Sequence, residues 1–208
     1  ISEALGEMGT MIARARMMID LAPDALADRH VALGDGIHRR ITRDPLGVVV
    51  DIAAWNYPLL IAGNVIVPGV LAGNAVVLKH ASQTAGVGRW FEEAFTRAGA
   101  PPGLVTAVTV RGRDASTLVQ HRGVDGLFFT GSVPAGRQVY SDVGARGHGF
   151  IDAGFELGGK DPAYVRADMP LDVVVPNLVE GAFYNAGQSC CAVERIYVAR
   201  ALYPDFVD

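Results

Sequence analysis

Short apolar segments alternate with segments of helical periodicity along this chain, and this alternation constrains its fold more than any other feature. The segments expected to be strands are 46–54, 75–79, 104–110, 126–130, 162–165 and 195–198. The segments expected to be helices are 2–21, which Pro23 should end, and 61–72, 84–98, 114–121, 134–143 and 171–185. Strands that alternate with helices form parallel sheets covered on both faces. The chain is therefore expected to be an α/β protein with a parallel sheet.

The pair Gly158-Gly159 is the best candidate for a domain boundary. It divides the chain into a first domain, residues 1–157, and a second domain, residues 158–208. The chain starts without an initiator methionine and stops where a further helix begins. We therefore expect it to be a piece of a longer protein.

The composition excludes several classes of function. Half of the residues are hydrophobic and 19% are charged, which is typical of a globular protein. The net charge of −4, with no basic run, gives no electrostatic footprint for nucleic acid or for a membrane surface. The two cysteines, Cys190 and Cys191, are adjacent and cannot form a disulfide framework, so we expect a reducing, cytoplasmic location.

One uncharged segment, 52–78, is long enough to cross a membrane. It contains three asparagines, two prolines and three glycines, which a lipid-facing helix would accommodate only at high cost. A strand, a loop, a helix and a second strand accommodate the same residues without strain. We therefore expect no membrane span here.

Polar residues follow three of the expected strands. The amide of Asn56, next to Trp55, could stabilise an oxyanion, or it could be a turn residue before Pro58. Lys79 follows the next strand, where a ribose or phosphate contact is expected, although a solvated lysine is equally consistent. The sequence has no Gly-x-Gly-x-x-Gly fingerprint. Instead, Gly131-Ser132 precedes a helix, where it could bind an anion or where Ser132 could simply cap the helix.

Two further residues are candidates for catalysis. Glu156 lies between apolar neighbours, and partial burial would raise its pKa toward the range of a general base. Alternatively, it is an exposed acid paired with Lys160. Cys190 lies three residues after Gly187 on a predicted turn, where a thiol could act as a nucleophile, or it is a buried structural cysteine. No histidine lies near enough in sequence to complete a metal site.

Each of these signals is weak alone, but their order along the chain is specific. The order and spacing resemble those of five successive motifs of the aldehyde dehydrogenase superfamily. These motifs are Trp55-Asn56-Tyr57-Pro58, Leu78-Lys79, Phe129-Thr130-Gly131-Ser132, Glu156-Leu157-Gly158-Gly159-Lys160 and Asn185-Ala186-Gly187-Gln188-Ser189-Cys190. The resemblance implies a parallel Rossmann-like cofactor-binding domain, residues 1–157, followed by the start of a second α/β catalytic domain, residues 158–208.

The resemblance also implies a reaction, the oxidation of a small aldehyde to its acid with NAD or NADP. Cys190 would be the nucleophile, and the amide of Asn56 would hold the oxyanion together with the Cys190 backbone N–H. Glu156 would activate the water that hydrolyses the thioester. The residues implied to contact the cofactor are Trp55, Lys79, Ser82, Gly112, Gly131 and Ser132.

Two departures from the family pattern qualify this expectation. Ser82 stands where many NAD-preferring members carry a glutamate, and its neutral side chain makes use of NADP credible. Family members are also longer at both ends. Their carboxyl-terminal half supplies most of the substrate tunnel and the strands that would form a homodimer or homotetramer. We therefore expect the 208-residue piece alone to be inactive.

Other function classes stay open at this point. In a CoA-acylating or phosphorylating relative, another acceptor would take the acyl group from Cys190, although Glu156 as a water-activating base argues for hydrolysis. A non-catalytic nucleotide-binding module would bind the cofactor with an inert thiol. A simple thiol hydrolase would not need the cofactor motifs.

Overall fold

The computed structural model describes residues 2–31, 34 and 36–208 of the chain. These residues form two compact units, 1–156 and 157–208, which are treated separately below. No helix in the described residues is both long enough and apolar enough to cross a membrane.

The first unit is built on a five-stranded sheet in which every neighbouring pair is parallel. The spatial order is β5-β4-β3-β6-β7. The strands are β3 (Val48–Ala53), β4 (Ala75–His80), β5 (Val105–Val108), β6 (Gly126–Thr130) and β7 (Asp152–Glu156). From the central strand β3 the chain first adds β4 and β5 on one side, and then β6 and β7 on the other side. This is the order of a doubly wound Rossmann-like sheet, with its switch point between β3 and β6.

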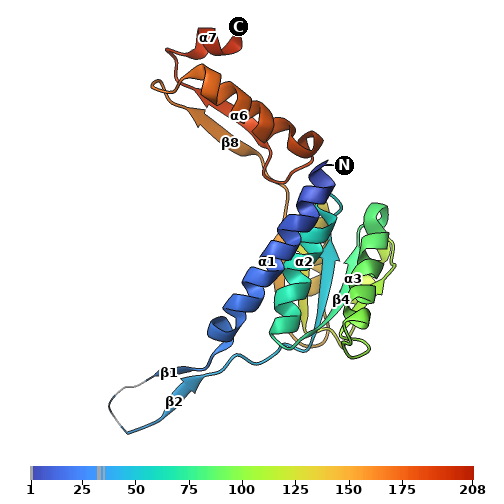
Figure 1. The fold of residues 1–208 in the computed structure, drawn as a ribbon. Coiled ribbons are helices and arrows are strands. Elements are labelled where there is room, and N and C mark those ends of the chain that lie inside the picture. The colour runs from blue at the N-terminus through green and yellow to red at the C-terminus, as the bar shows by residue number, and fades with distance from the viewer. Residues whose placement is uncertain (1, 32–33, 35) are drawn as a thin grey trace. The chain divides into compact units, whose positions relative to one another are not determined.

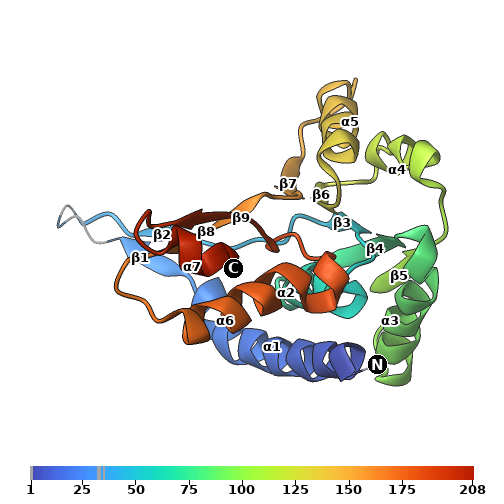
Figure 2. The same ribbon diagram turned by 90° about the horizontal axis from the view of Figure 1, so that it is seen from above.

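Helices cover both faces of this sheet. The longer ones are α1 (Ser2–Leu26), α2 (Pro58–Leu71), α3 (Ala85–Arg97) and α5 (Val133–Gly144), and α4 (Ser116–Val119) is a single turn. Figure 1 shows α1 lying along α2, and Figure 2 shows α4 and α5 on the opposite side of the sheet from α1, α2 and α3. Each face has its own apolar core, centred on Ile66 and Leu78 under α2 and on Leu127 and Val119 under α4 and α5. The parallel α/β architecture expected from the sequence is confirmed.

Two local expectations about the helices of this unit are wrong, and one strand pair was not predicted. Helix α1 continues past Pro23 to Leu26, so the missing N–H of the proline weakens only its last turns. Helix α2 begins at Pro58 rather than at residue 61, because the fixed φ of proline suits the first helical position. A short antiparallel pair, β1 (Arg29–Val31) and β2 (Arg39–Ile41), was not predicted. These strands are mostly exposed and polar, so they lack the apolar pattern of a buried strand.

Strand β7 was also not predicted, because its sequence Asp-Ala-Gly-Phe-Glu contains no apolar run. It is the edge strand next to β6, and most of its residues are exposed or only half-buried. Its Gly154 lies beside the ring of Phe128, where an added Cβ would come within 2.8 Å of a ring carbon. The strand is therefore specified by its fit to β6 rather than by its own hydrophobicity.

The second unit is a parallel strand pair with a crossover helix. Strand β8 (Asp161–Val165) pairs with β9 (Val193–Val198), and α6 (Leu171–Phe183) connects them. The one-turn 3-10 helix η3 (Tyr184–Gly187) follows α6, and α7 (Tyr203–Val207) follows β9. The helix and both strands expected in this part of the sequence are present.

Candidate functional site

The predicted cofactor residues of the first unit follow the carboxyl ends of neighbouring parallel strands. Trp55 and Asn56 follow β3, whereas Gly131 and Ser132 follow β6, the strand beside it. Both segments therefore leave the sheet at the same edge and at its switch point. Ligands of open α/β sheets bind in the crevice at this position.

The turn between β3 and α2 is anchored by a side chain from another helix. The backbone N–H groups of Leu59 and Leu60 both donate to Oε1 of Glu7 on α1, at 2.7 and 2.9 Å. These N–H groups belong to the first turn of α2, which would otherwise be an anion-binding helix end. The carboxylate of Glu7 thus occupies that end. In the preceding turn, Asn56 is half-buried and Trp55 is 41% exposed.

The start of helix α5 is capped by a residue of its own segment and not by a side chain from another helix. Ser132 is its N-cap, and its Oγ accepts a hydrogen bond from the N–H of Ala135 at 3.4 Å. The capping role considered for Ser132 is therefore present, and the first turn contains no acidic residue. A Cβ on Gly131 would lie 2.7 Å from the ring of Phe129, so a side chain at this position would require the ring or the backbone to shift.

Lys79 is the penultimate residue of β4, the other neighbour of β3, and Ser82 follows the carboxyl end of that strand. Lys79 is only 6% exposed, so the alternative of a solvated lysine is wrong. Burial lowers the pKa of its ammonium group. Ser82 is exposed and begins the 3-10 helix η1 (Ser82–Thr84). Ser82 therefore lies at the surface, shortly after the end of the strand that contains Lys79.

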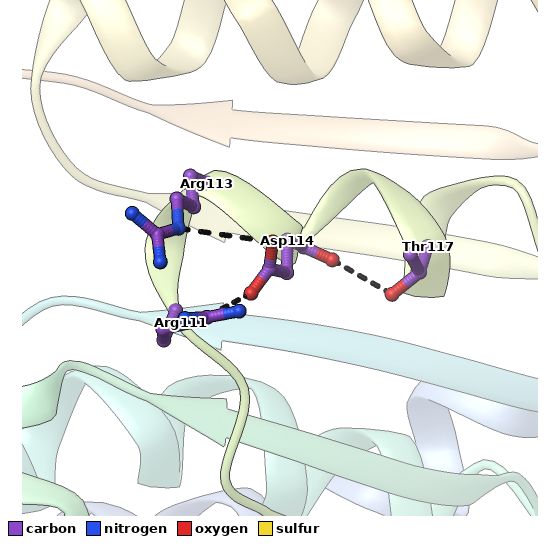
Figure 3. A network of polar contacts seen from close by, with 4 residues as sticks. All are labelled: Arg111, Arg113, Asp114 and Thr117. Carbon is purple, nitrogen blue, oxygen red and sulfur yellow. Dashed lines mark hydrogen bonds and ion pairs between the residues drawn. The ribbon is translucent and has the colours of Figure 1, made fainter.

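Gly112 begins the 3-10 helix η2 (Gly112–Asp114) after β5, beside an exposed cluster of charges. Nε of Arg111 donates to Asp114 Oδ2 at 2.6 Å, and Nε of Arg113 lies 4.0 Å from Oδ1 (Figure 3). Oγ1 of Thr117 donates to the Asp114 carbonyl at 2.7 Å (Figure 3). Two guanidinium groups thus share one carboxylate, which leaves a local excess of positive charge.

Glu156 is the last residue of β7 and lies opposite Thr130 in the register with β6. It is exposed, so the expected partial burial is wrong. Successive side chains of a strand point to opposite faces, and its neighbour Phe155 packs on the other face against Phe129. The alternative pairing is not found either, because Lys160 forms its ion pair with Glu194.

Cys190 follows a strained turn in the second unit. Asn185, Ala186 and Gly187 have φ values of 52°, 57° and 74° in succession. An alanine in this left-handed conformation costs about 1 kcal/mol, and such strain is concentrated at functional sites. The carbonyl of Cys190 also lies 3.0 Å from the position of a Cβ on Gly159, so the turn approaches this glycine closely.

Both cysteines of this turn are exposed and unpaired, so the alternative of a buried structural Cys190 is wrong. Partial burial of the Cys190 thiol raises its pKa, and the adjacent Cys191 thiol adds to the increase. Oγ of Ser189 lies 3.2 Å from Sγ of Cys191. Within the described residues no cluster of His, Cys, Asp and Glu could hold a metal ion.

The sequence predicts no role for Glu7 and His80, which both contact the first turn of α2. Glu7 has no local signal, since only the packing of α1 on α2 brings it to the turn after β3. His80 stands beside Lys79 at a strand end, which is a signal, but only the structure provides its two partners, Pro58 and Thr84.

Comparison with known proteins identifies the family. The profile of the aldehyde dehydrogenase family matches residues 1–208. The D-glyceraldehyde dehydrogenase (NADP(+)) of Thermoplasma acidophilum is 36% identical over 180 residues, which cover 85% of this chain and 36% of that protein. The chain thus spans about a third of the length of this relative.

Solved structures agree with this result. Succinic semialdehyde dehydrogenase from Streptococcus pyogenes, in complex with NADP+, superposes with a TM-score of 0.91 at 28% identity, over 99% of this chain and 44% of that one. The NAD-dependent aldehyde dehydrogenase from Sinorhizobium meliloti gives a TM-score of 0.90 at 31% identity, over 97% and 40%. The motifs occur in the expected order, and the parallel sheet has its switch point where motif residues lie. Together with the profile match, these findings show that this chain belongs to the aldehyde dehydrogenase family.

Proposed function

We propose that the complete protein oxidises an aldehyde to a carboxylic acid with NADP+ or NAD+. The observation that carries this proposal is the set of motif residues at the switch point of the parallel sheet, in a chain of this family. In the proposal, residues 1–156 bind the cofactor and residues 157–208 contribute the nucleophile.

The residues at the sheet edge fit a dinucleotide. The start of α2, where a Rossmann fold usually binds phosphate, is occupied by the Glu7 carboxylate. The pyrophosphate is therefore assigned to the start of α5, where Gly131 and Ser132 bring backbone and hydroxyl groups to a helix end that lacks acidic side chains. Trp55, which is substantially exposed, would form a wall of the cleft.

The adenosine end of the cofactor is assigned to Lys79, Ser82 and Gly112. In the described part of the chain, no carboxylate forms an ion pair with Lys79, so its ammonium group can donate to ribose oxygens. The neutral Ser82 leaves room for a 2′-phosphate, and the guanidinium groups of Arg111 and Arg113 follow the next strand at the same edge. This arrangement favours NADP+, which the Thermoplasma relative uses according to its name.

The reaction begins with the attack of the Cys190 thiolate on the aldehyde carbon. The amide of Asn56 and the backbone N–H of Cys190 stabilise the oxyanion of the resulting thiohemiacetal. NAD(P)+, held by the residues assigned above in the first unit, would supply the acceptor for the hydride that leaves the thiohemiacetal carbon. The product on Cys190 is a thioester, and the carboxylate of Glu156 removes a proton from the water that hydrolyses it. One aldehyde, one NAD(P)+ and one water thus give one acid, one NAD(P)H and one proton.

Exposure of Glu156 and Cys190 supports these roles, because water and substrate must reach both groups. Since burial raises the pKa of Cys190, its thiol is mostly protonated at neutral pH. Attack therefore requires removal of that proton, and the rate of the thiol step should increase with pH.

The assay of the complete protein is the direct test. We expect aldehydes of several sizes to give NADPH and carboxylic acid in equal amounts, with no need for CoA or phosphate. Cys190→Ala should abolish NADPH formation, and Cys191→Ser, the matched control one residue away, should retain most of it. Full activity in Cys190→Ala would refute the proposal. Formation of an acyl-CoA instead of free acid would favour the acyl-transferring alternative.

A further inference from the structure

The turn that carries Asn56 is held by two polar side chains that the proposed reaction does not use. Glu7 accepts hydrogen bonds from the N–H groups of Leu59 and Leu60. On the other side, Nε2 of His80 lies 2.9 Å from the carbonyl oxygen of Pro58. The beginning of α2 is thereby attached both to α1 and to the carboxyl end of β4.

The hydrogen bonds of His80 are compatible with a neutral ring that carries its proton on Nε2. A carbonyl oxygen can only accept, so Nε2 must carry a proton and donate to Pro58. Nδ1 lies 2.8 Å from Oγ1 of Thr84, whose hydroxyl can donate to the unprotonated nitrogen of a neutral ring. Burial lowers the pKa of His80, which agrees with a neutral imidazole. His80 is only 5% exposed, and both of its ring nitrogens have hydrogen-bond partners inside the protein.

These contacts restrict the position of Asn56. Only four residues separate Ala53, the end of β3, from Pro58, the start of α2. Strand β3 is fixed by pairing on both sides, and the start of α2 is fixed by Glu7 and His80. The proline also restricts Tyr57, the residue before it. Asn56 therefore lies in a short connection whose two ends are both anchored.

We propose that Glu7 and His80 are positioning residues that hold the Asn56 turn in the geometry required for oxyanion stabilisation. The inference rests on the proposed role of Asn56. Oxyanion donors act only when they are aimed at the developing charge before the reaction, and a shift of about 1 Å can reduce the rate about 100-fold. His80 also belongs to β4, the strand that contains Lys79. His80 therefore connects the strand assigned to cofactor binding with the turn that carries Asn56.

The test compares two replacements of His80 in the complete protein. His80→Leu removes the donor to Pro58 while it preserves most of the buried volume, whereas the side-chain amide of His80→Gln can still donate. We expect His80→Leu to lower kcat about 10- to 100-fold with a KM for NADP+ within about threefold of the wild-type value. His80→Gln should recover most of the lost kcat. Equal activity of both variants and the wild-type protein would overturn the proposal.

A double-mutant cycle with Asn56→Ala separates positioning from a structural role. If His80 acts through Asn56, the effect of His80→Leu on kcat should shrink to about threefold or less in the Asn56→Ala background. An undiminished effect would mean that His80 acts elsewhere. If Asn56→Ala by itself leaves kcat unchanged, the assigned role of Asn56 fails, whereas a loss with Asn56→Ala but none with His80→Leu rejects the positioning role alone.

Two milder variants keep the proposal testable if His80→Leu does not fold. Thr84→Val removes only the hydroxyl that orients the imidazole, and we expect a kcat about two- to fivefold lower. Glu7→Gln keeps an oxygen acceptor for Leu59 and Leu60 and should stay within about threefold of the wild-type kcat, whereas Glu7→Leu should lose about tenfold or more. Wild-type kcat in both Thr84→Val and Glu7→Leu would refute the proposal.

Discussion

At the scale of single residues, burial and not residue type decides the chemistry of the charged groups in this protein. Lys79 is buried near the end of β4, whereas Glu156 is exposed at the end of the edge strand β7. Lys79 was a candidate because of its position at a strand end, and Glu156 because it lies between apolar neighbours in the sequence. The alternation of side chains across the sheet explains the exposure of Glu156, since Phe155, the preceding residue of the strand, packs on the other face.

Asp51 is the most unusual of these residues. It lies in the central strand β3 with no exposed surface, and neither carboxylate oxygen has a hydrogen-bond partner among the described residues. Burial raises the pKa of its carboxyl group well above the ordinary value. The folded state therefore binds a proton more tightly than the unfolded state does. Its contribution to stability is largest at low pH and is lost as the pH rises through the folded-state pKa.

Asp51→Asn should remove this pH dependence because the amide does not titrate. We expect the free energy of unfolding of the variant to exceed that of the wild type by a margin that grows with pH, by at most about 1.4 kcal/mol per unit. Denaturant titrations at a series of pH values measure the margin. Asp20→Asn, at an exposed position on α1, should follow the wild-type curve. A constant margin across the series would contradict the buried, protonated state of Asp51.

At the scale of elements, two helix starts that look alike in a topology diagram differ in their contacts. The start of α2 binds the carboxylate of Glu7, whereas the start of α5 is capped by its own Ser132. The connection before α5 is tight, because Gly131 lies against the ring of Phe129. This close approach brings the helix start near the end of β6.

Gly131→Ala tests that connection. The added Cβ would lie 2.7 Å from the Phe129 ring, so we expect a loss of about 1–3 kcal/mol of stability from overpacking. Displacement of the α5 start should also weaken NADP+ binding, as measured by calorimetry. Gly86→Ala, on α3, is the control, since no atom lies within 4 Å of the added Cβ. Equal stability and NADP+ affinity in the two variants would show that the close approach at Gly131 has no consequence.

At the scale of the whole molecule, the strand order determines which loops can act together on one cofactor. The loops after β4 and β5 leave the same edge of the sheet, so Ser82 and the pair Arg111 and Arg113 belong to neighbouring connections. In the proposed function, the neutral Ser82 and these two arginines together favour NADP+, because they can accommodate its 2′-phosphate.

Ser82→Glu should reverse that preference. A carboxylate repels the 2′-phosphate and can accept hydrogen bonds from the ribose hydroxyls of NAD+, so the ratio of the Kd for NADP+ to the Kd for NAD+ should rise about tenfold or more. Calorimetric titration of the complete protein measures this ratio without catalysis. Gln83→Glu adds the same charge one residue further along the chain and should change the ratio much less. An unaltered ratio in Ser82→Glu would refute the assignment of Ser82.

The sequence alone determined the alternation of strands and helices, the class of sheet and the family, because the hydrophobic period and the motif residues are local properties. It missed β7 and the β1–β2 pair, since edge and surface strands need no apolar run. Only the tertiary structure decided the order β5-β4-β3-β6-β7, the attachment of Glu7 and His80 to the Asn56 turn, the burial of Lys79 and the exposure of Glu156. Strand order and burial depend on contacts between residues far apart in the chain, and no local pattern encodes those contacts.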